Sequence, residues 1–278
     1  MLPTDHNASP PDFNRTAVRA LEDGLFAAPA IGEAHVVLCD SSAWTSLVGS
    51  AQELLSPAEG ARAARLRFDR DRSSFILAHA FWRVSLGICL DVHAAEVRLT
   101  STAAGQPQLL GTAFSTSLSH SGEWVALAIC AGTTIGVDIE RSPSHTALTA
   151  LMPTICTPGE IADLEPLPLP QREAALLALW TRKEALLKAF GVGLNVDPAL
   201  LSATTDGLVS PPSSFTTLDP VPCRVSNLGL PDGLVGALAV PDSIESVRLC
   251  TLGTSPAIAA HFMRLTSHKT YSTIDKHN

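Results

Sequence analysis

The sequence predicts an α+β fold made of two related halves, and two helix-start signals of the same form are the first reason. Ser56–Glu59 (S-P-A-E) and Thr157–Glu160 (T-P-G-E) each combine an N-cap hydroxyl, a proline at the first helical position and a glutamate that can close a capping box. Each signal leads to a long apolar segment, 75–86 in one case and 173–190 in the other. We therefore expect one long helix in each half.

Two alanine-rich apolar runs are the second reason, because each is typical of a buried strand. They are Trp124–Ile129 and Leu234–Val240, and each follows its long helix after a similar interval. The order of helix start, long helix and strand thus occurs twice, which divides the chain near Ala131–Ile135. An ordinary α+β protein can show such a repetition by chance. The pattern alone therefore favours neither two related halves nor a chance repetition.

These signals set the expected organisation of the chain. We expect an N-terminal half over 21–132 and a C-terminal half over 133–265. The polar ends, 1–20 and 266–278, are predicted to be flexible.

Composition favours a water-soluble globular protein and disfavours a nucleic-acid binder. Of the 278 residues, 46% are hydrophobic, and the formal net charge is −8, whereas nucleic-acid binders usually present a basic face. The chain begins without an apolar targeting segment, and no uninterrupted apolar run reaches the roughly 18 residues of a membrane helix. None of the six cysteines forms a C-x-x-C pair, which favours reduced thiols in a cytoplasmic protein over a disulfide framework.

The segment Gly136–Glu140 (G-V-D-I-E) is the first candidate for chemistry. Apolar and acidic residues alternate, so a strand would place Asp138 and Glu140 on one face. Two neighbouring carboxylates repel each other unless a cation, a proton or solvent intervenes. The alternative is a strand with a merely solvated polar face, and this short pattern alone favours that alternative.

A helical stripe is the second candidate. Trp180, Glu184 and Lys188 are spaced four residues apart, so they share one face of the predicted helix, which ends at Gly191. A surface helix with a Glu184–Lys188 pair is the simpler interpretation, but a large aromatic residue on the same stripe suits the wall of a cleft. The spacing of these residues alone does not decide between a surface helix and a cleft wall.

The third candidate is Ser117–Gly122 (S-L-S-H-S-G), whose small polar residues can present hydroxyls, an imidazole and backbone N–H groups to an anion. A Ser-His hydrolase is disfavoured, because no G-x-S-x-G elbow is present and adjacent residues of a strand point to opposite faces. A turn with a structural histidine is the alternative.

Taken together, the three segments indicate a phosphate site with an oxygen-ligated cation. Carboxylates suit Mg²⁺, and a histidine and a lysine supply donors for phosphate. With these residues the sequence resembles the 4′-phosphopantetheinyl transferases, in the monomeric surfactin-synthetase-activating branch. The resemblance runs from about Ser56 to Val196. Its pieces are L-S-H-S-G at 118–122, G-V-D-I-E at 136–140 and W-x-x-K-E-A-x-x-K-x-x-G-x-G-L at 180–194.

The resemblance implies a fold and a reaction. The fold is two similar halves in a pseudo-twofold arrangement, each a small three-stranded antiparallel sheet packed on a long helix, with the active site at the interface. In the reaction a serine of an acyl or peptidyl carrier protein attacks the β-phosphate of coenzyme A, the co-substrate. Adenosine 3′,5′-bisphosphate then leaves.

The resemblance also implies roles for individual residues. Asp138, Glu140 and Glu184 hold Mg²⁺, with Mn²⁺ as an alternative ion, together with the pyrophosphate. Glu184 is the base for the serine, directly or through a metal-bound water, and the sequence does not choose between the two. Lys188 stabilises or protonates the departing phosphate, and His120 assists.

Contacts with coenzyme A are implied for Ser119, His120 and Lys188, with help from Arg72 and Lys183. The family usually has Lys or Arg between Gly105 and Pro107, where this chain has Gln106, which offers a hydrogen bond without a charge.

The partner implied is an acyl or peptidyl carrier domain, and the chain is expected to act as a monomer, without nucleic acid or membrane. Carrier domains are usually acidic, so we expect a local apolar docking patch with cations such as Arg182 and Lys183. Two other functions remain open. One is a Mg²⁺-dependent nucleotide phosphohydrolase, and the other is a non-catalytic scaffold, although a scaffold would be expected to lack the three acidic residues.

Overall fold

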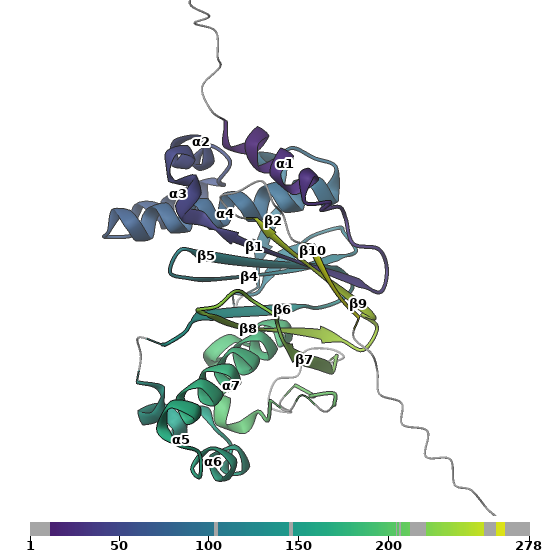
Figure 1. Ribbon diagram of the computed structural model, residues 1–278. Helices are drawn as coiled ribbons and strands as arrows, with labels where there is room; N and C mark the ends of the chain where they lie inside the picture. The colour runs from purple at the N-terminus through teal and green to yellow at the C-terminus, as the bar shows by residue number, and fades with distance from the viewer. Residues whose placement is uncertain are drawn as a thin grey trace, which may run out of the picture.

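Two sheets packed face to face form the centre of the molecule, and helices cover both outer faces (Figure 1). The computed structural model describes residues 12–102, 105–144, 147–203, 205, 207–211, 221–252 and 260–264. The helices are α1 (Phe13–Asp23), α2 (Val48–Gln52), α3 (Pro57–Ala64), α4 (Asp69–Leu90), α5 (Met152–Ile155), α6 (Pro158–Leu164) and α7 (Leu169–Phe190). This mixed α+β architecture confirms the predicted fold class.

The strands divide into two main sheets and one short ribbon. They are β1 (Glu33–Asp40), β2 (Leu99–Ser101), β3 (Pro107–Leu109), β4 (Phe114–Ser121), β5 (Trp124–Ala131), β6 (Gly136–Arg141), β7 (Cys223–Asn227), β8 (Leu234–Pro241), β9 (Ser246–Leu252) and β10 (Ala260–Arg264). The larger sheet has the order β10-β9-β1-β5-β4, the smaller sheet has the order β6-β8-β7, and β2 pairs with β3.

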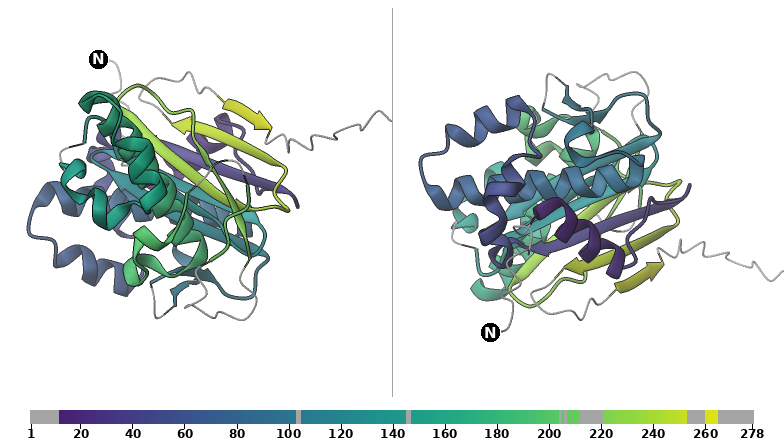
Figure 2. Two further views of the ribbon diagram at one scale, coloured as in Figure 1. Left: turned by 90° about the horizontal axis from the view of Figure 1, so that it is seen from below. Right: turned by 90° about the horizontal axis from the view of Figure 1, so that it is seen from above.

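Apolar cores fill the spaces between the layers. Helix α4 packs on the outer face of the larger sheet, and α7 packs on the outer face of the smaller sheet (Figure 2). A third core lies between the two sheets, where Val36 and Ala128 face Val137 and Leu238. Among the residues that the structure describes, one helix, α4, is long and apolar enough to cross a membrane, but 72% of its most apolar window is buried within the protein, as in the core helix of a globular protein.

The larger sheet differs from the expected three-stranded antiparallel sheet. Strands β9 and β10, from the end of the chain, extend the sheet of the first half, and β9 runs parallel to β1. The predicted C-terminal half, 133–265, therefore contributes strands to both sheets. The physical reason is that the six central residues of β1 are buried, and an uncovered apolar strand edge would invite aggregation.

Both predicted helix starts are confirmed as capping boxes. Ser56 and Thr157 accept hydrogen bonds from the N–H groups of Glu59 and Glu160, whose carboxylates bond back to the N-cap N–H groups. Both predicted long helices are also present, within α4 and α7. The six cysteines are free, and all except the half-buried Cys89 are buried.

Each capping-box glutamate also anchors the long helix that follows it. Glu59 accepts a hydrogen bond from Arg83 Nε at 2.7 Å, and Glu160 pairs with Lys183 Nζ at 2.6 Å. Lys183 is fully buried and also donates to the carbonyl of Pro198. Burial lowers the pKa of Lys183, and the charge of Glu160 opposes that shift. Lys183 therefore has a structural position in the core.

We predict that Lys183→Met destabilises the protein by about 3–5 kcal/mol, because it leaves the largely enclosed Glu160 carboxylate, 14% exposed, without its partner charge. Chemical denaturation would measure the free energy of unfolding. The double variant Lys183→Met/Glu160→Gln removes both charges and should recover part of the loss. A double variant as unstable as the sum of its two single variants would contradict a coupled pair.

Candidate active site

A ladder of serine hydroxyls joins the edges of the two sheets. Strand β4 carries serines at alternate positions, and the hydroxyl oxygens of three of them accept an N–H from β6. The contacts are Ser117 Oγ with Val137 N at 3.1 Å, Ser119 Oγ with Ile139 N at 3.3 Å, and Ser121 Oγ with Arg141 N at 3.1 Å. This ladder fixes the register of β6 against β4.

Two of these hydroxyls also hold the strand carboxylates. Ser119 donates to Asp138 Oδ1 and Ser121 donates to Glu140 Oε2, each at 2.8 Å. Val137 and Ile139, on the opposite face of β6, are buried in the core between the sheets. The predicted alternation of β6 is confirmed, and its polar face is not simply solvated, because Asp138 is 5% exposed.

Helix α7 brings Glu184 and Lys188 to the same place. The backbones of β6 and α7 are in direct contact at Gly136, where an added Cβ would lie 1.9 Å from the carbonyl oxygen of Ala185. Lys188 Nζ donates to Asp138 Oδ1 at 2.7 Å and to the carbonyl of Val137 at 3.1 Å.

Glu184 completes a cluster of three mutually repelling carboxylates. Burial raises the pKa of Glu184 to about 7, and the negative charge of Asp138 adds to this shift while Lys188 opposes it. The pKa of Glu140 is also raised, first by burial and then by the charge of Asp138, against the hydrogen bond from Ser121. The three acids that the sequence singled out therefore lie close enough to influence one another.

The cluster has the donor chemistry of a hard-cation site. Asp138 Oδ2 and Glu184 Oε1 are buried and have no hydrogen-bond partner within the described part of the chain, and such orphaned oxygens are rare in native proteins. Carboxylate oxygens are the ligands that Mg²⁺ prefers. Among the same residues, no three His, Cys, Asp or Glu side chains are already grouped to hold a metal ion, and Asp138 instead shares its Oδ1 with Lys188 and Ser119.

A cavity of about 510 Å³ opens beside the cluster. Residues of α3, α4, β4, the β2–β3 ribbon and the end of α7 line it, so both halves contribute. Its basic side chains are Arg62, His79, His120 and Lys188, and its apolar walls include Phe75, Trp82, Leu99 and Leu118. The pKa of His120 is lowered, first by loss of solvent and then by the positive charges of Lys188 and His79. The cavity is therefore suited to an anionic ligand with an apolar part.

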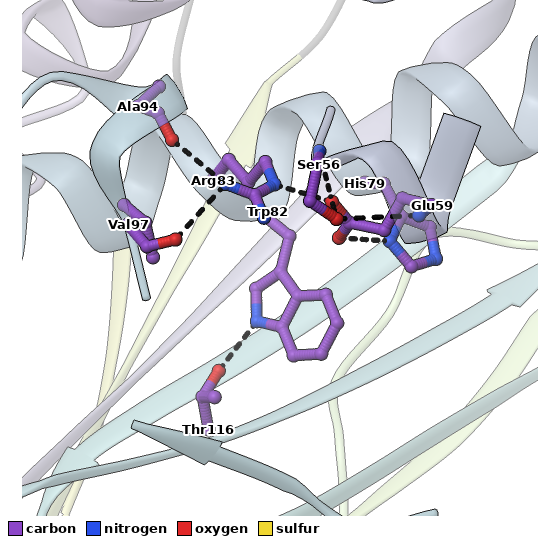
Figure 3. A network of polar contacts seen from close by, with 8 residues as sticks. All are labelled: Ser56, Glu59, His79, Trp82, Arg83, Ala94, Val97 and Thr116. Atoms are coloured by element: carbon purple, nitrogen blue, oxygen red, sulfur yellow. Dashed lines mark hydrogen bonds and ion pairs between the residues drawn. The ribbon is translucent and has the colours of Figure 1, made fainter. Parts of the chain in front are cut away.

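The wall formed by α3 and α4 is held by a network around Glu59 (Figure 3). Glu59 accepts hydrogen bonds from Arg83 and from the N–H and hydroxyl of Ser56, and His79 Nδ1 lies 2.9 Å from its Oε1. Arg83 also donates to the carbonyls of Ala94 and Val97. Burial alone would raise the pKa of Glu59, but the hydrogen bonds of His79 and Ser56 outweigh it and lower the pKa to about 2.

Comparison with known proteins agrees with this site. Residues 134–227, which include β6 and α7, match the family model of the 4′-phosphopantetheinyl transferase superfamily. The predicted resemblance is thus confirmed by a match that contains the three acidic residues and Lys188.

Individual relatives carry the same family name. HetI of Nostoc sp., a 4′-phosphopantetheinyl transferase, is 34% identical over 145 residues, which are 50% of this chain and 61% of HetI. A Synechocystis sp. protein is 29% identical over 152 residues, 54% of this chain and 62% of that protein. The chain therefore spans about three fifths of the length of these two relatives. The 4′-phosphopantetheinyl transferase psf-1 of Bacillus pumilus is 26% identical over 77% of this chain and 85% of its own length.

The structure brings most of the predicted transferase residues together. Asp138, Glu140, Glu184 and Lys188 form the cluster, and His120 and Gln106 line the cavity. Ser119 faces β6, where its hydroxyl is used by Asp138 and Ile139, so the adjacent Ser119 and His120 do point to opposite faces of β4.

Two predicted coenzyme A contacts lie elsewhere. Arg72 pairs with Asp69 at the start of α4 and is not among the residues that line the cavity, and Lys183 is in the core. Sequence reasoning missed Arg62, Glu59 and His79. Glu59 was interpreted only as a helix start, and the four-residue spacing of Phe75 and His79 on the predicted helix was the available signal for His79.

Gln106 has a further contact that its residue type did not suggest. Its Nε2 donates to the carbonyls of Lys188 at 3.5 Å and Ala189 at 3.3 Å in the last turn of α7, which also accept from Gly191 N and Thr134 Oγ1 respectively. Gly191, with a φ of 68°, ends that helix, and an added Cβ there would lie 2.1 Å from Gln106 Oε1. Gln106 therefore connects the β2–β3 ribbon to the turn that carries Lys188.

A second cavity of about 460 Å³ borders the cluster at Glu140. Glu140 and Trp180 line it, together with Leu148, Leu151 and Leu177. Trp180 and Lys188, which share one face of α7, thus line different cavities, and Lys188 pairs with Asp138.

We predict that Glu59 makes stability depend on acid pH. Its pKa in the folded protein is about 2, below the ordinary glutamate value of 4.5, so its contribution to stability is complete above pH 4.5 and is lost as pH falls toward 2. The contribution is roughly 3 kcal/mol. Thermal unfolding between pH 5 and pH 2.5 measures how the melting temperature falls with pH. Glu59→Gln should make this fall less steep, whereas Glu22→Gln, an exposed control on α1, should not. If the melting temperature of Glu59→Gln fell with pH as steeply as that of the wild type, Glu59 would not be the source of the pH dependence.

Proposed function

We propose that this chain transfers the 4′-phosphopantetheine group of coenzyme A to a serine of an acyl or peptidyl carrier protein. We further propose that the reaction depends on Mg²⁺ and releases adenosine 3′,5′-bisphosphate. The observation that carries the proposal is the cluster of Asp138, Glu140 and Glu184 at the edge of a basic cavity. Both halves belong to one chain, which supports a monomeric enzyme.

The first cavity is the proposed coenzyme A site. Its volume of about 510 Å³ is typical of a small-molecule site. Arg62 and Lys188 supply positive charge and His79 and His120 supply further hydrogen-bond donors for phosphates, while Phe75 and Trp82 provide apolar surface for the rest of the ligand. Trp82 is fixed by a 2.7 Å hydrogen bond from its Nε1 to Thr116 Oγ1, so this wall is pre-organised.

Asp138, Glu140 and Glu184 would hold the Mg²⁺, or Mn²⁺ in its place. The two buried oxygens that lack a partner, Asp138 Oδ2 and Glu184 Oε1, support this assignment. When bound, the ion supplies positive charge that stabilises the negative charge on a transferring phosphoryl group.

The protein groups supply proton transfer and orientation. The serine oxygen forms a bond to the β-phosphorus, and the bond from that phosphorus to the bridging oxygen breaks. The serine proton passes to Glu184, directly or through a water. The bridging oxygen leaves with adenosine 3′,5′-bisphosphate, and Lys188 is placed to stabilise its charge.

We also propose that the two halves are a duplicated, pseudo-twofold unit. Helices α4 and α7 both have 22 residues and begin at Asp69 and Leu169, 100 positions apart. At that offset Arg83 corresponds to Lys183, and both pair with a capping-box glutamate. Glu184 and Lys188 correspond to Val84 and Ile88, so only the second half would contribute these reacting groups.

The proposal predicts that Asp138→Ala abolishes transfer without unfolding the protein. The wild type, incubated with coenzyme A, Mg²⁺ and an apo carrier, should add the mass of one phosphopantetheine group to the carrier. Loss of a charge-stabilising interaction of several kcal/mol should slow the variant by about 100-fold or more. Intact-mass spectrometry of the carrier measures the rate.

Glu173→Ala, an exposed carboxylate on the same helix as Glu184, is the matched control and should retain activity. Free phosphopantetheine without modified carrier would point instead to a phosphohydrolase. Carrier binding without either product would point to a scaffold. Unchanged turnover in Asp138→Ala would refute the role of the acidic cluster.

Lys188→Ala should reduce kcat by about 100-fold, a typical loss for removing one group that stabilises developing negative charge. Its affinity for the carrier should be unchanged, because Lys188 lies within the first cavity. Steady-state kinetics and calorimetric binding of the apo carrier separate the two effects. Lost carrier affinity at an intact kcat would contradict the assignment.

A further inference from the structure

The connection between α3 and α4 presents an aromatic side chain and three arginines to solvent. Phe68 is 61% exposed, and the guanidinium of Arg67 lies 5.4 Å from the centre of its ring. Arg65 and Arg70 are exposed on either side. We call Arg65, Arg67, Phe68 and Arg70 the arginine patch.

Fold stability does not account for Phe68. It occupies the N-cap of α4, where its side chain forms no capping hydrogen bond. Ser, Thr, Asp or Asn at that position would stabilise the helix by about 1 kcal/mol. The ring contributes little burial in return, because most of it is exposed. An exposed aromatic residue among arginines is instead typical of the residues that dominate binding at protein interfaces.

The patch is connected to the proposed active site. Arg70 pairs with Glu123 in the turn between β4 and β5, and Glu123 lies 3.5 Å from Arg141 Nη1. Arg141 directly follows Glu140 on β6. The start of α4, the β4–β5 turn and the end of β6 lie on the same side of the molecule (Figure 1). A partner seated on the patch would therefore be beside the acidic cluster.

The local charge defines the partner. The protein has a formal net charge of −8, whereas residues 65–72 contain four arginines and two aspartates. An acidic protein would be repelled at long range and attracted at this place, which favours one docking orientation. Phe68 additionally requires an apolar recess, which a phosphate backbone does not offer.

The two cations expected from the sequence to dock the carrier form contacts within the protein. Lys183 is buried against Glu160, and Arg182 donates to the carbonyl of Ala203 and to Asn227 Oδ1.

We propose that the arginine patch docks an acidic surface of the apo carrier protein, with Phe68 inserted in an apolar recess of the carrier. This inference rests on the proposed transferase function. It adds the surface by which the acceptor serine is presented to the cluster.

The test compares Phe68→Ala and Arg67→Glu with two matched controls remote from the patch. Ile31→Ala removes an apolar side chain that is 95% exposed at the opposite end of β1, and Arg19→Glu reverses an exposed charge on α1. Transfer is measured with the apo carrier varied at saturating coenzyme A, and then with coenzyme A varied. Both patch variants should raise the KM for the carrier about tenfold, the effect of losing roughly 1.4 kcal/mol of binding. Their kcat and their KM for coenzyme A should stay within about twofold of wild type, as a loss confined to carrier binding requires.

A salt series provides an independent measurement. The KM of the wild type should rise with ionic strength, and that of Arg67→Glu should rise less. A carrier KM unchanged in both patch variants, or changed equally in the controls, would overturn the proposal. A changed KM for coenzyme A would assign the patch to the first cavity instead, and inhibition of transfer by an RNA oligonucleotide with unchanged carrier KM would assign it to nucleic acid.

Failure of the proposed function is visible separately, because the wild type would then modify no carrier. In that case calorimetric binding of the apo carrier still tests the patch. Binding by the wild type that Phe68→Ala weakens about tenfold supports the proposal, and equal binding by both overturns it.

Discussion

The contact between β4 and β6 is the constraint on which the site depends. Adjacent edge strands normally pair through their backbones, but here serine hydroxyls of β4 accept the N–H groups of β6. A hydroxyl both donates and accepts, so Ser119 and Ser121 can hold Asp138 and Glu140 while they hold the strand. The contact that joins the halves therefore also positions the carboxylates. A substitution of Ser119 or Ser121 would disturb both the packing of β6 on β4 and the acidic cluster.

In each half a capping-box glutamate pairs with a cation of the long helix, but the two pairs lie in different surroundings. Glu59 fixes Arg83 and also forms part of the cavity wall, whereas Glu160 fixes Lys183 within the core. Buried ion pairs contribute little net stability, but each one specifies where its long helix must lie. In the second half that specification determines where Glu184 and Lys188 point, since both follow Lys183 within little more than one turn.

The parts of the structure that could be predicted from sequence were the local ones. Capping boxes and the alternation of β6 depend on residues a few positions apart, and both were confirmed. The parallel pairing of β9 with β1 depends on segments about 200 residues apart, and no local pattern encodes it. Lys183 shows a second limit, because membership of a motif does not tell which face of a helix a residue occupies. Glu184 and Lys188 share a face, and their neighbour Lys183 points into the core.

Gln106 shows how charge is distributed around the cavity. A lysine or arginine at this position would also suit the negative end of α7, so the neutral amide gives up a favourable interaction with the helix dipole. The cavity, however, already concentrates Arg62, His79, His120 and Lys188, and the pKa of His120 is lowered, after burial, by several of these charges. One more cation would add to that repulsion. The amide of Gln106 forms the hydrogen bonds to the carbonyls of Lys188 and Ala189 without adding to the repulsion among these cations. It therefore holds the end of α7 without changing the charge of the cavity.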